Sequence, residues 1–355
     1  MTVSRRNLLK NAGIFGASAA VTSQGLAMSS KPAVDPLADR EMVDFGHGVA
    51  SGDPLSDRVI LWTRISPEIN APVAVTWRIC EDMQMQQEVN TGTFTTDSSR
   101  DFTVKVDADG LLPNTWYFYQ FSVGEKLSAI GRTKTAAESD LDRLRLAVVS
   151  CSSFPHGYFN VYRVLAERND LDAIIHLGDY LYEYGVGEYG DKKLELQRDL
   201  LPKHEIISLT DYRQRHNLYK RDEDLQALHQ QYPFIVTWDD HEFANDTWKD
   251  GAGNHNDNEG DFLIRKAKAK QAYFEWMPIR HQPEDLGSCY RKLPFGNLVD
   301  LLMLDTRVEG RDEQPSGLYA QRIRHDENRT LMGFEQEAWL HNQLKSSTAK
   351  WKISA

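Results

Sequence analysis

Four runs of mostly apolar residues constrain the fold of this chain more than any other feature. The runs are Leu144–Val149, Ala173–Leu177, Pro233–Thr237 and Val299–Leu304. Such runs are typical of strands that are buried on both faces, as parallel strands between two layers are. Helices are predicted between them, at Tyr158–Glu167, Asp211–Gln231 and Phe262–Trp276. The pattern therefore predicts a layered α/β domain over residues 140–355.

The region before residue 140 has shorter runs of β-branched and aromatic residues. These runs are Arg58–Arg64, Val73–Ile79, Phe102–Val106 and Trp116–Phe121. Turn signals such as Asp109-Gly110 separate them. Regular spacing of short strands indicates a small β-sandwich, which we expect at residues 43–135. The stretch Leu112–Tyr117 is similar to the turn and tyrosine of fibronectin-type modules.

The first 27 residues have the order of parts found in an export signal. Arg5 and Arg6 form a paired-arginine start, and the uncharged run Ala12–Val21 follows. Gly25–Ala27 then supplies small residues at a cleavage position. This order predicts a twin-arginine signal peptide over residues 1–27, with the twin-arginine translocase as a partner and a periplasmic or secreted location. The alternative is a basic start followed by a short core helix.

The charge balance excludes one class of partner. The chain of 355 residues has 41 Lys and Arg against 52 Asp and Glu, a formal net charge of -11. An acidic chain without a basic stripe repels a phosphate backbone, so nucleic acid is not an expected partner. No run of about 18 or more apolar residues follows the leader, so no membrane span is expected. We expect a monomer.

Polar side chains follow each of the four apolar runs. The segments are Ser150–Ser152, Gly178–Tyr182, Trp238–Glu242 and Asp305–Arg307. Because the carboxyl ends of parallel strands share one edge of a sheet, these segments would bring thiol, carboxylate, phenol and imidazole groups into one crevice. Each group alone has an ordinary explanation: Cys151 as a small buried residue, Asp179 as a helix cap and Tyr182 as a packed ring.

The neighbouring carboxylates favour a metal. Asp239 and Asp240 at a sheet edge repel each other unless a cation or a proton lies between them, although in a solvated turn they would need neither. Thiolate and phenolate suit a transition ion, and phenolate suits ferric iron in particular. Carboxylate and amide oxygens suit calcium or magnesium. A two-metal centre fits this mixture best, since it activates water and orients a phosphate ester.

The motifs at these positions resemble those of the alkaline phosphatase D family, which includes related bacterial phospholipases D. The matching segments are Phe45–Pro54, Cys151-Ser152, His176–Gly185, Asp211–Arg213, Trp238–Glu242 and Leu304–Arg307. The spacing of Asp179 and Tyr182 is also similar to that in purple acid phosphatases. The resemblance implies an α/β protein in which a fibronectin-like β-sandwich precedes a metallophosphoesterase-type layered domain.

The resemblance also implies a metal centre with iron(III) (Fe3+) and calcium (Ca2+) as cofactors. Cys151 and Tyr182 would bind the iron. Asp179 would bridge iron and calcium. Asp240 would bind calcium, with help from Asn245.

The substrate side of the site follows from the same resemblance. His241 would lie beside the substrate phosphate as a catalytic acid or an orienting group. Arg307 would bind substrate phosphate, although an Arg at this position pairs with a carboxylate at least as often. The expected reaction is hydrolysis of small-molecule or lipid phosphate esters, monoesters or diesters or both, by a metal-bound hydroxide. The alternatives are a phospholipase D type phosphodiesterase and an inactive homologue that acts only in binding.

The chain departs from the family at its carboxyl end. Family members continue past the positions of Trp339-Leu340 and Trp351-Lys352, and their additional part carries a Gly-Asp-x-His-like segment with further metal ligands. We therefore expect the catalytic domain over residues 140–355 to be incomplete, with an exposed sheet edge and with weak or absent activity.

Overall fold

The computed structural model describes residues 43–68, 70–190, 198–281, 287–318 and 320–355. These residues belong to a compact unit that spans Glu41–Ala355. The expected export signal over residues 1–27 lies outside the described residues. Within the part that is described, no helix combines the length and the hydropathy needed to cross a membrane.

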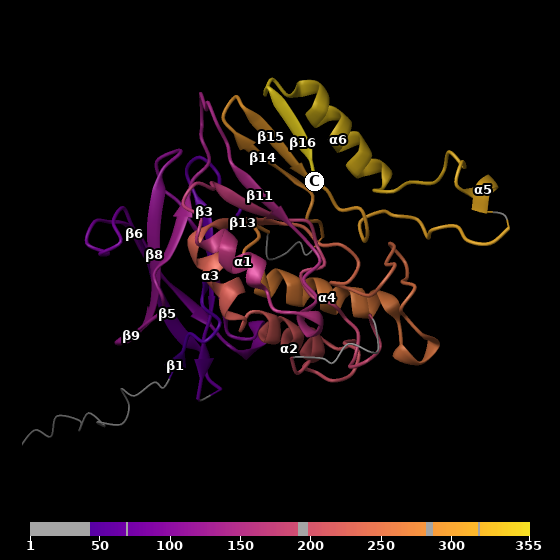
Figure 1. Cartoon of the computed structure of the whole chain (residues 1–355), viewed down its shortest axis with the longest axis horizontal. Helices are drawn as coiled ribbons and strands as arrows, with labels where there is room; N and C mark the ends of the chain where they lie inside the picture. The colour runs from indigo at the N-terminus through magenta and orange to yellow at the C-terminus, as the bar shows by residue number, and fades with distance from the viewer. Residues whose placement is uncertain (1–42, 69, 191–197, 282–286, 319) are drawn as a thin grey trace, which may run out of the picture. The chain divides into compact units, whose positions relative to one another are not determined.

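Two β-sheets pack face to face in the amino-terminal part of this unit (Figure 1). The first is antiparallel with the order β10-β8-β5-β6, and β9 pairs with β8. Its strands are β5 (Val73–Cys80), β6 (Glu88–Thr96), β8 (Trp116–Val123), β9 (Lys126–Leu127) and β10 (Gly131–Lys134). Val75 and Tyr119 of this sheet share a buried cluster with Leu61 and Val104 of the second sheet. The two facing sheets therefore enclose one apolar core.

The second sheet has six strands in the order β11-β12-β13-β2-β3-β7. They are β2 (Val49–Gly52), β3 (Val59–Arg64), β7 (Thr103–Ala108), β11 (Leu146–Val149), β12 (Ala173–His176) and β13 (Pro233–Val236). Strands β11, β12, β13 and β2 are parallel, whereas β3 and β7 are antiparallel to their neighbours. This sheet therefore joins strands from both sides of the boundary expected at residues 135–140.

Strands β12 and β13 contribute to two hydrophobic cores. Ile174 and Phe234 lie in a cluster with four helices, whereas Ile175 and Ile235 lie in a cluster with a third sheet. The helices are α1 (Asn160–Ala166), α2 (Leu209–Tyr219), α3 (Glu223–Gln231) and α4 (Phe262–Trp276). Because side chains alternate along a strand, both faces of the sheet are covered. The α/β class predicted from the apolar runs is confirmed.

The single helix predicted over Asp211–Gln231 is in fact two helices, α2 and α3. Ser208 begins α2 with a capping box that includes Asp211. Asp222 begins α3, and its Oδ1 accepts a hydrogen bond from the backbone N–H of Leu225 at 2.9 Å. Such caps let the chain change direction between two helices.

The third sheet contains β14 (Arg291–Phe295), β15 (Val299–Met303) and β16 (Trp351–Ser354). Strand β15 is antiparallel to β14 and parallel to β16. The prediction that the run Val299–Leu304 belongs to the same parallel sheet as the other three runs is therefore wrong. The strand is buried throughout, as expected, but burial alone does not identify the neighbouring strand.

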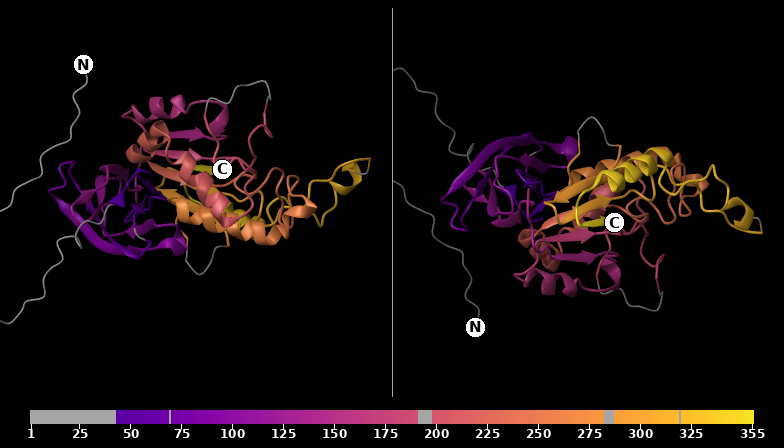
Figure 2. Two further views of the ribbon diagram at one scale, coloured as in Figure 1. Left: turned by 90° about the horizontal axis from the view of Figure 1, so that it is seen from below. Right: turned by 90° about the horizontal axis from the view of Figure 1, so that it is seen from above.

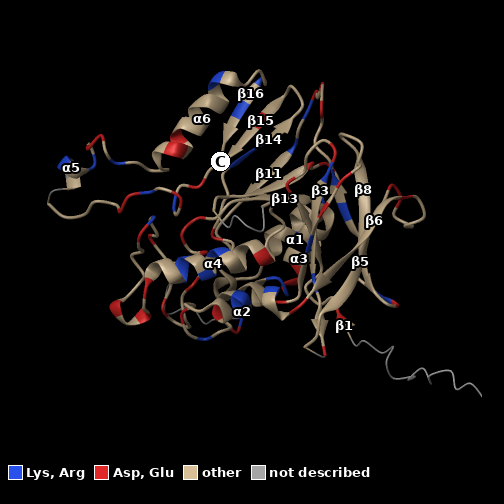
Figure 3. Ribbon diagram, turned by 180° about the vertical axis from the view of Figure 1, so that it is seen from behind, with Lys and Arg blue, Asp and Glu red and all other residues tan. Residues whose placement is uncertain are grey.

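Helix α6 (Phe334–Ser346) lies alongside the third sheet (Figures 1 and 2). Its first turn contains Glu335 and Glu337 and its last turn contains Lys345, a distribution that the helix dipole favours and that Figure 3 shows. Shorter elements are β1 (Val43–Asp44), β4 (Ser66–Pro67), α5 (Ala320–Ile323) and the 3-10 turns Ser98–Arg100, Phe154–His156 and Asp257–Glu259.

A buried ion pair ties the six-stranded sheet to the third sheet. Asp53, directly after β2, is 1% exposed and accepts hydrogen bonds from the Arg291 side chain at 2.5 and 2.9 Å. Its Oδ2 also accepts the backbone N–H of Arg280 at 2.7 Å. Removing this carboxylate would leave the Arg291 guanidinium largely buried without its partner.

We predict that Asp53→Asn lowers the free energy of unfolding by about 3 kcal/mol, a typical cost of removing one partner of a buried pair. Asp57→Asn is the matched control, because Asp57 is exposed and pairs with the partly exposed Arg58. It should change the free energy of unfolding by less than about 0.5 kcal/mol. Urea unfolding followed by circular dichroism measures both. If Asp53→Asn changed the free energy of unfolding as little as Asp57→Asn does, the Asp53–Arg291 pair would not hold the two sheets together.

Candidate metal centre

The segments that follow β11 and β12 meet at the carboxyl edge of the six-stranded sheet. Cys151 and Asp179 both adopt the left-handed backbone conformation, with φ of 60° and 51°. The Cys151 thiol donates to Oδ2 of Asp179 at 3.4 Å, and the Tyr182 phenol donates to the same oxygen at 3.3 Å. Gly178 packs so closely on Asp239 that a Cβ would lie 2.2 Å from its backbone nitrogen. Such strained turns cost on the order of 1 kcal/mol per residue and are concentrated at functional sites.

Three buried side chains at this edge form a candidate cation site. One ligand atom from each of Asp179, Asp240 and His241 lies within 4.8 Å of the others. Oδ1 of Asp179 is buried and has no hydrogen-bond partner among the described residues. A buried carboxylate oxygen without a donor is costly unless a cation or a proton neutralises it. The two carboxylates, one of them with an orphaned oxygen, fit a metal.

The carboxyl groups of this cluster resist ionisation. Burial raises the pKa of Asp179, and the neighbouring carboxylates raise it further, against the lowering effect of His241. Burial also raises the pKa of Asp240, against the lowering effects of Arg307 and His241. Positive charge placed between the two carboxyl groups would favour their ionised forms.

The thiol and the phenol are also held in their protonated forms. Burial raises the pKa of the Cys151 thiol and of the Tyr182 phenol, and Asp179 raises both further. Cys151 is a free cysteine, as are Cys80 and Cys289. Both groups therefore need a nearby cation to act as anionic ligands.

His241 is held by a second buried carboxylate. Its Nδ1 lies 2.7 Å from Oε2 of Glu183, which is fully buried. Glu183 also accepts the backbone N–H of Asn245 at 2.7 Å and the side-chain amide of Asn254 at 2.9 Å. Burial lowers the pKa of His241, but Glu183, Asp179 and the nearby Asp240 raise it to about 9. The Glu183 contact fixes the ring and leaves Nε2 available to the cluster.

Glu242 joins the two loops that carry the carboxylates. Its buried side chain accepts the backbone N–H groups of Tyr180 at 2.6 Å, Asp239 at 2.9 Å and Asp179 at 3.1 Å. Burial raises the pKa of Glu242 to about 8, and Asp179 raises it as well, against the lowering effect of these N–H groups. The loops after β12 and β13 are therefore fixed to each other through one side chain.

Arg307 contacts Asp240 directly, whereas Asn245 is linked to it through Asp246. Nε of Arg307 lies 2.5 Å from Oδ1 of Asp239, and its Nη1 lies 3.4 Å from Oδ2 of Asp240. The side-chain amide of Asn245 donates to Asp246 at 2.9 Å, and the backbone N–H of Asp246 donates to Asp240 at 2.6 Å. Arg307 reaches the cluster although β15 belongs to another sheet. In this structure it pairs with carboxylates.

The structure thus brings together the residues that the strand-end argument selected. Cys151, Asp179 and Tyr182 are in contact, and Asp240 and His241 complete the group. The sequence reasoning missed Glu183 and Glu242. Each is adjacent to a selected residue, but a sequence does not distinguish a buried supporting carboxylate from a solvated one.

Comparison with known proteins identifies relatives of both parts of the chain. The PhoD-like phosphatase family matches residues 146–355, and the N-terminal domain of PhoD-like phosphatases matches residues 29–137. Alkaline phosphatase D of Bacillus subtilis (strain 168) is 39% identical over 372 residues, which cover 100% of this chain and 62% of that protein. The chain therefore spans about three fifths of the length of this relative.

A solved structure titled "Structure of PhoD" has the same fold. It superposes with a TM-score of 0.80 and 40% identity, covering 87% of this chain and 61% of that one. The resemblance inferred from the motifs is confirmed by these matches. The chain belongs to the PhoD-like phosphatase family.

Proposed function

We propose that this chain carries the cation centre of a metal-dependent phosphoesterase that hydrolyses phosphate monoesters, diesters or both. The proposal rests on the cluster of Asp179, Asp240 and His241 at the carboxyl edge of the sheet. Cys151 and Tyr182 are both in contact with Asp179. Membership of the PhoD-like phosphatase family and the likeness to alkaline phosphatase D support it.

The proposed cofactors are iron(III) and calcium. Cys151 and Tyr182 would hold iron, Asp179 would face both ions, and Asp240 and Asn245 would hold calcium. The orphaned Oδ1 of Asp179 supports this assignment, because Oδ2 is the oxygen that the thiol and the phenol share. When bound, the cations supply Lewis-acid activation of water and neutralise charge on the phosphate.

The side chains beside the cluster orient the phosphate. Glu183 occupies Nδ1 of His241, so the imidazolium donates from Nε2 to the oxygen of the departing alcohol. Arg307 already lies against Asp239 and Asp240 and donates to the phosphate oxygens from the same position. Both groups contribute positive charge next to the dianionic or monoanionic ester.

Asp179→Asn tests the proposed function. We expect hydrolysis of 4-nitrophenyl phosphate in the presence of calcium to fall more than about a hundredfold, beyond the loss caused by changing a group that only supports a ligand. Iron and calcium bound per chain, measured by elemental analysis, should fall as well. Asp170→Asn, a change at an exposed ion pair, is the control and should leave both unchanged. Full turnover by wild-type protein that contains neither metal would contradict the proposal.

Glu183→Gln tests how His241 is held. The pKa of His241 is about 9, because Glu183, Asp179 and Asp240 together outweigh the effect of burial. Removing the Glu183 charge should therefore lower this pKa, and a larger fraction of the imidazole would be neutral at pH 7.5. Histidine NMR titration of metal-free protein measures this, with Glu188→Gln as the control. A pKa that stays near 9 in Glu183→Gln would show that another group holds the proton.

We also propose export through the twin-arginine route to the periplasm or beyond, on the basis of Arg5, Arg6 and the run Ala12–Val21. Replacing both arginines with lysine should keep the precursor in the cytoplasm, since paired arginines identify the substrates of this route. Cell fractionation followed by immunoblotting measures the distribution. If the double-lysine protein were exported as efficiently as the parent, the signal would be of another type.

A further inference from the structure

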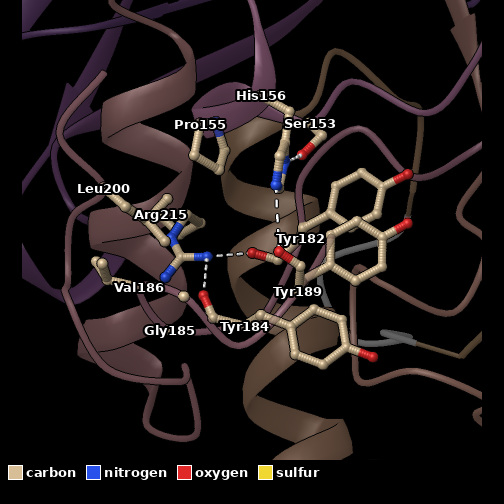
Figure 4. Close-up of a pocket in the computed structure, with 11 residues that line it drawn as sticks. Ser153, Pro155, His156, Tyr182, Tyr184, Gly185, Val186, Tyr189, Leu200 and Arg215 are labelled. Atoms are coloured by element: carbon tan, nitrogen blue, oxygen red, sulfur yellow. Dashed lines mark hydrogen bonds between the residues drawn. The ribbon is translucent and has the colours of Figure 1, made fainter. Parts of the chain in front are cut away.

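Three tyrosines form a stack beside the candidate metal centre (Figure 4). Tyr189 lies between the other two, with its ring centroid 5.1 Å from that of Tyr182 and 4.9 Å from that of Tyr184. The imidazole of His241 lies 4.2 Å from the Tyr182 ring and 5.7 Å from the other two. We call Tyr182, Tyr184 and Tyr189 the tyrosine stack. Its hydroxyl groups point to the same side, and that of Tyr182 contacts Asp179.

Two of these phenols have unused donors. The hydroxyl groups of Tyr184 and Tyr189 have no hydrogen-bond partner among the described residues. Tyr184 is partly exposed, and Tyr189 is 38% exposed. A phenolic hydroxyl can donate as well as accept a hydrogen bond. The outer part of the stack therefore presents apolar ring surface and neutral O–H groups.

The backbone around the tyrosine stack is firmly held. Arg215 is fully buried and donates to the carbonyl oxygens of Tyr182 and Tyr184. Nε2 of His156 lies 3.2 Å from the carbonyl oxygen of Tyr189. Figure 4 shows these contacts around the pocket. Because these residues are already ordered, binding a ligand against them costs less conformational entropy of the protein.

The surroundings of the tyrosine stack favour an apolar ligand group. Charged groups of both signs lie close by, since the carboxylates of Glu183 and Asp240 act on Tyr184 and the His241 ring lies 5.7 Å from the Tyr184 ring. Arg215 lines the same pocket, but its N–H groups donate to backbone carbonyls. An ester substituent would gain ring contact here, whereas a charged phosphate oxygen would not.

We propose that Tyr184 and Tyr189 are specificity-determining residues that bind the uncharged second ester group of a phosphodiester. The inference rests on the proposed function, since the phosphate itself must lie at the candidate metal centre. The rings contact the apolar atoms of the second ester group, and the two phenols donate to its oxygen. A monoester lacks the second ester substituent and therefore gains no contact with the rings.

Two aryl esters with the same leaving group test this inference. Bis(4-nitrophenyl) phosphate has a second ester group, and 4-nitrophenyl phosphate does not. We expect Tyr189→Ala to lower kcat/KM about tenfold for the diester, the loss of roughly one aromatic contact, and to change it less than about twofold for the monoester. Tyr184→Phe and Tyr189→Phe keep the rings and should therefore lower the diester value less, by about threefold each. Phe334→Ala, an exposed aromatic at the start of α6, is the control.

A binding measurement separates this inference from the proposed function. Diphenylphosphinate imitates a diester, phenylphosphonate imitates a monoester, and neither has an ester bond to cleave. Calorimetry on protein loaded with iron and calcium should show about tenfold weaker binding of the phosphinate to Tyr189→Ala, from the lost aromatic contact, and unchanged binding of the phosphonate.

The outcomes are distinct. If wild-type protein hydrolyses neither aryl ester but shows this difference in binding, the proposed function fails and the role of the tyrosine stack stands. If wild-type protein hydrolyses either ester, while Tyr189→Ala weakens both ligands equally or neither of them, the proposed function stands. In that case the specificity role is overturned.

Discussion

The repulsion between buried carboxylates is the constraint on which this site depends. Asp179, Asp239 and Asp240 converge at one edge of a sheet, where burial and mutual charge raise the pKa of Asp179 and Asp240. Arg307 compensates part of this charge from the Asp239 side. Oδ1 of Asp179 is left without a donor among the described residues. The position that most needs positive charge is therefore the position between the thiol, the phenol and the two carboxylates.

The surrounding fold stabilises this site against its backbone strain and its buried charge. Strands β12 and β13 are covered on both faces, so their carboxyl ends are rigid points of attachment for the loops. Glu242 then fixes the loops after β12 and β13 to each other, and Glu183 fixes His241 to the segment that holds Asn245. These two buried glutamates position the cluster without belonging to it. The left-handed turns at Cys151 and Asp179 persist because their surroundings leave no relaxed alternative.

Much of this arrangement could be predicted from the sequence. The apolar runs identify the strands, and β12 and β13 are buried on two faces as predicted. The prediction is wrong for β11, an edge strand in which Val148 is 59% exposed. The residues that follow these strands meet at one edge, as expected for Cys151, Asp179 and Asp240. The sheet of β15 could not be predicted, because burial on both faces is the same in either sheet. The break between α2 and α3 depends on Asp222, which caps the start of α3. The sequence does not show that Asp222 is a cap unless the start of α3 is already known. The supporting roles of Glu183 and Glu242 depend on contacts across more than 50 residues.

Visible absorption of the iron-loaded protein tests the central claim most directly, because a phenolate bound to iron(III) gives a charge-transfer band of its own, in addition to the absorption of a bound Cys151 thiolate. Wild-type protein and Tyr184→Phe should both show the band, with about one iron per chain, as expected for a single phenolate-bearing iron site. Tyr182→Phe should lose it, since Tyr182 is the phenol that contacts Asp179. A band that is unchanged in Tyr182→Phe, with stoichiometric iron, would contradict the assignment of the strand-end cluster as the metal centre.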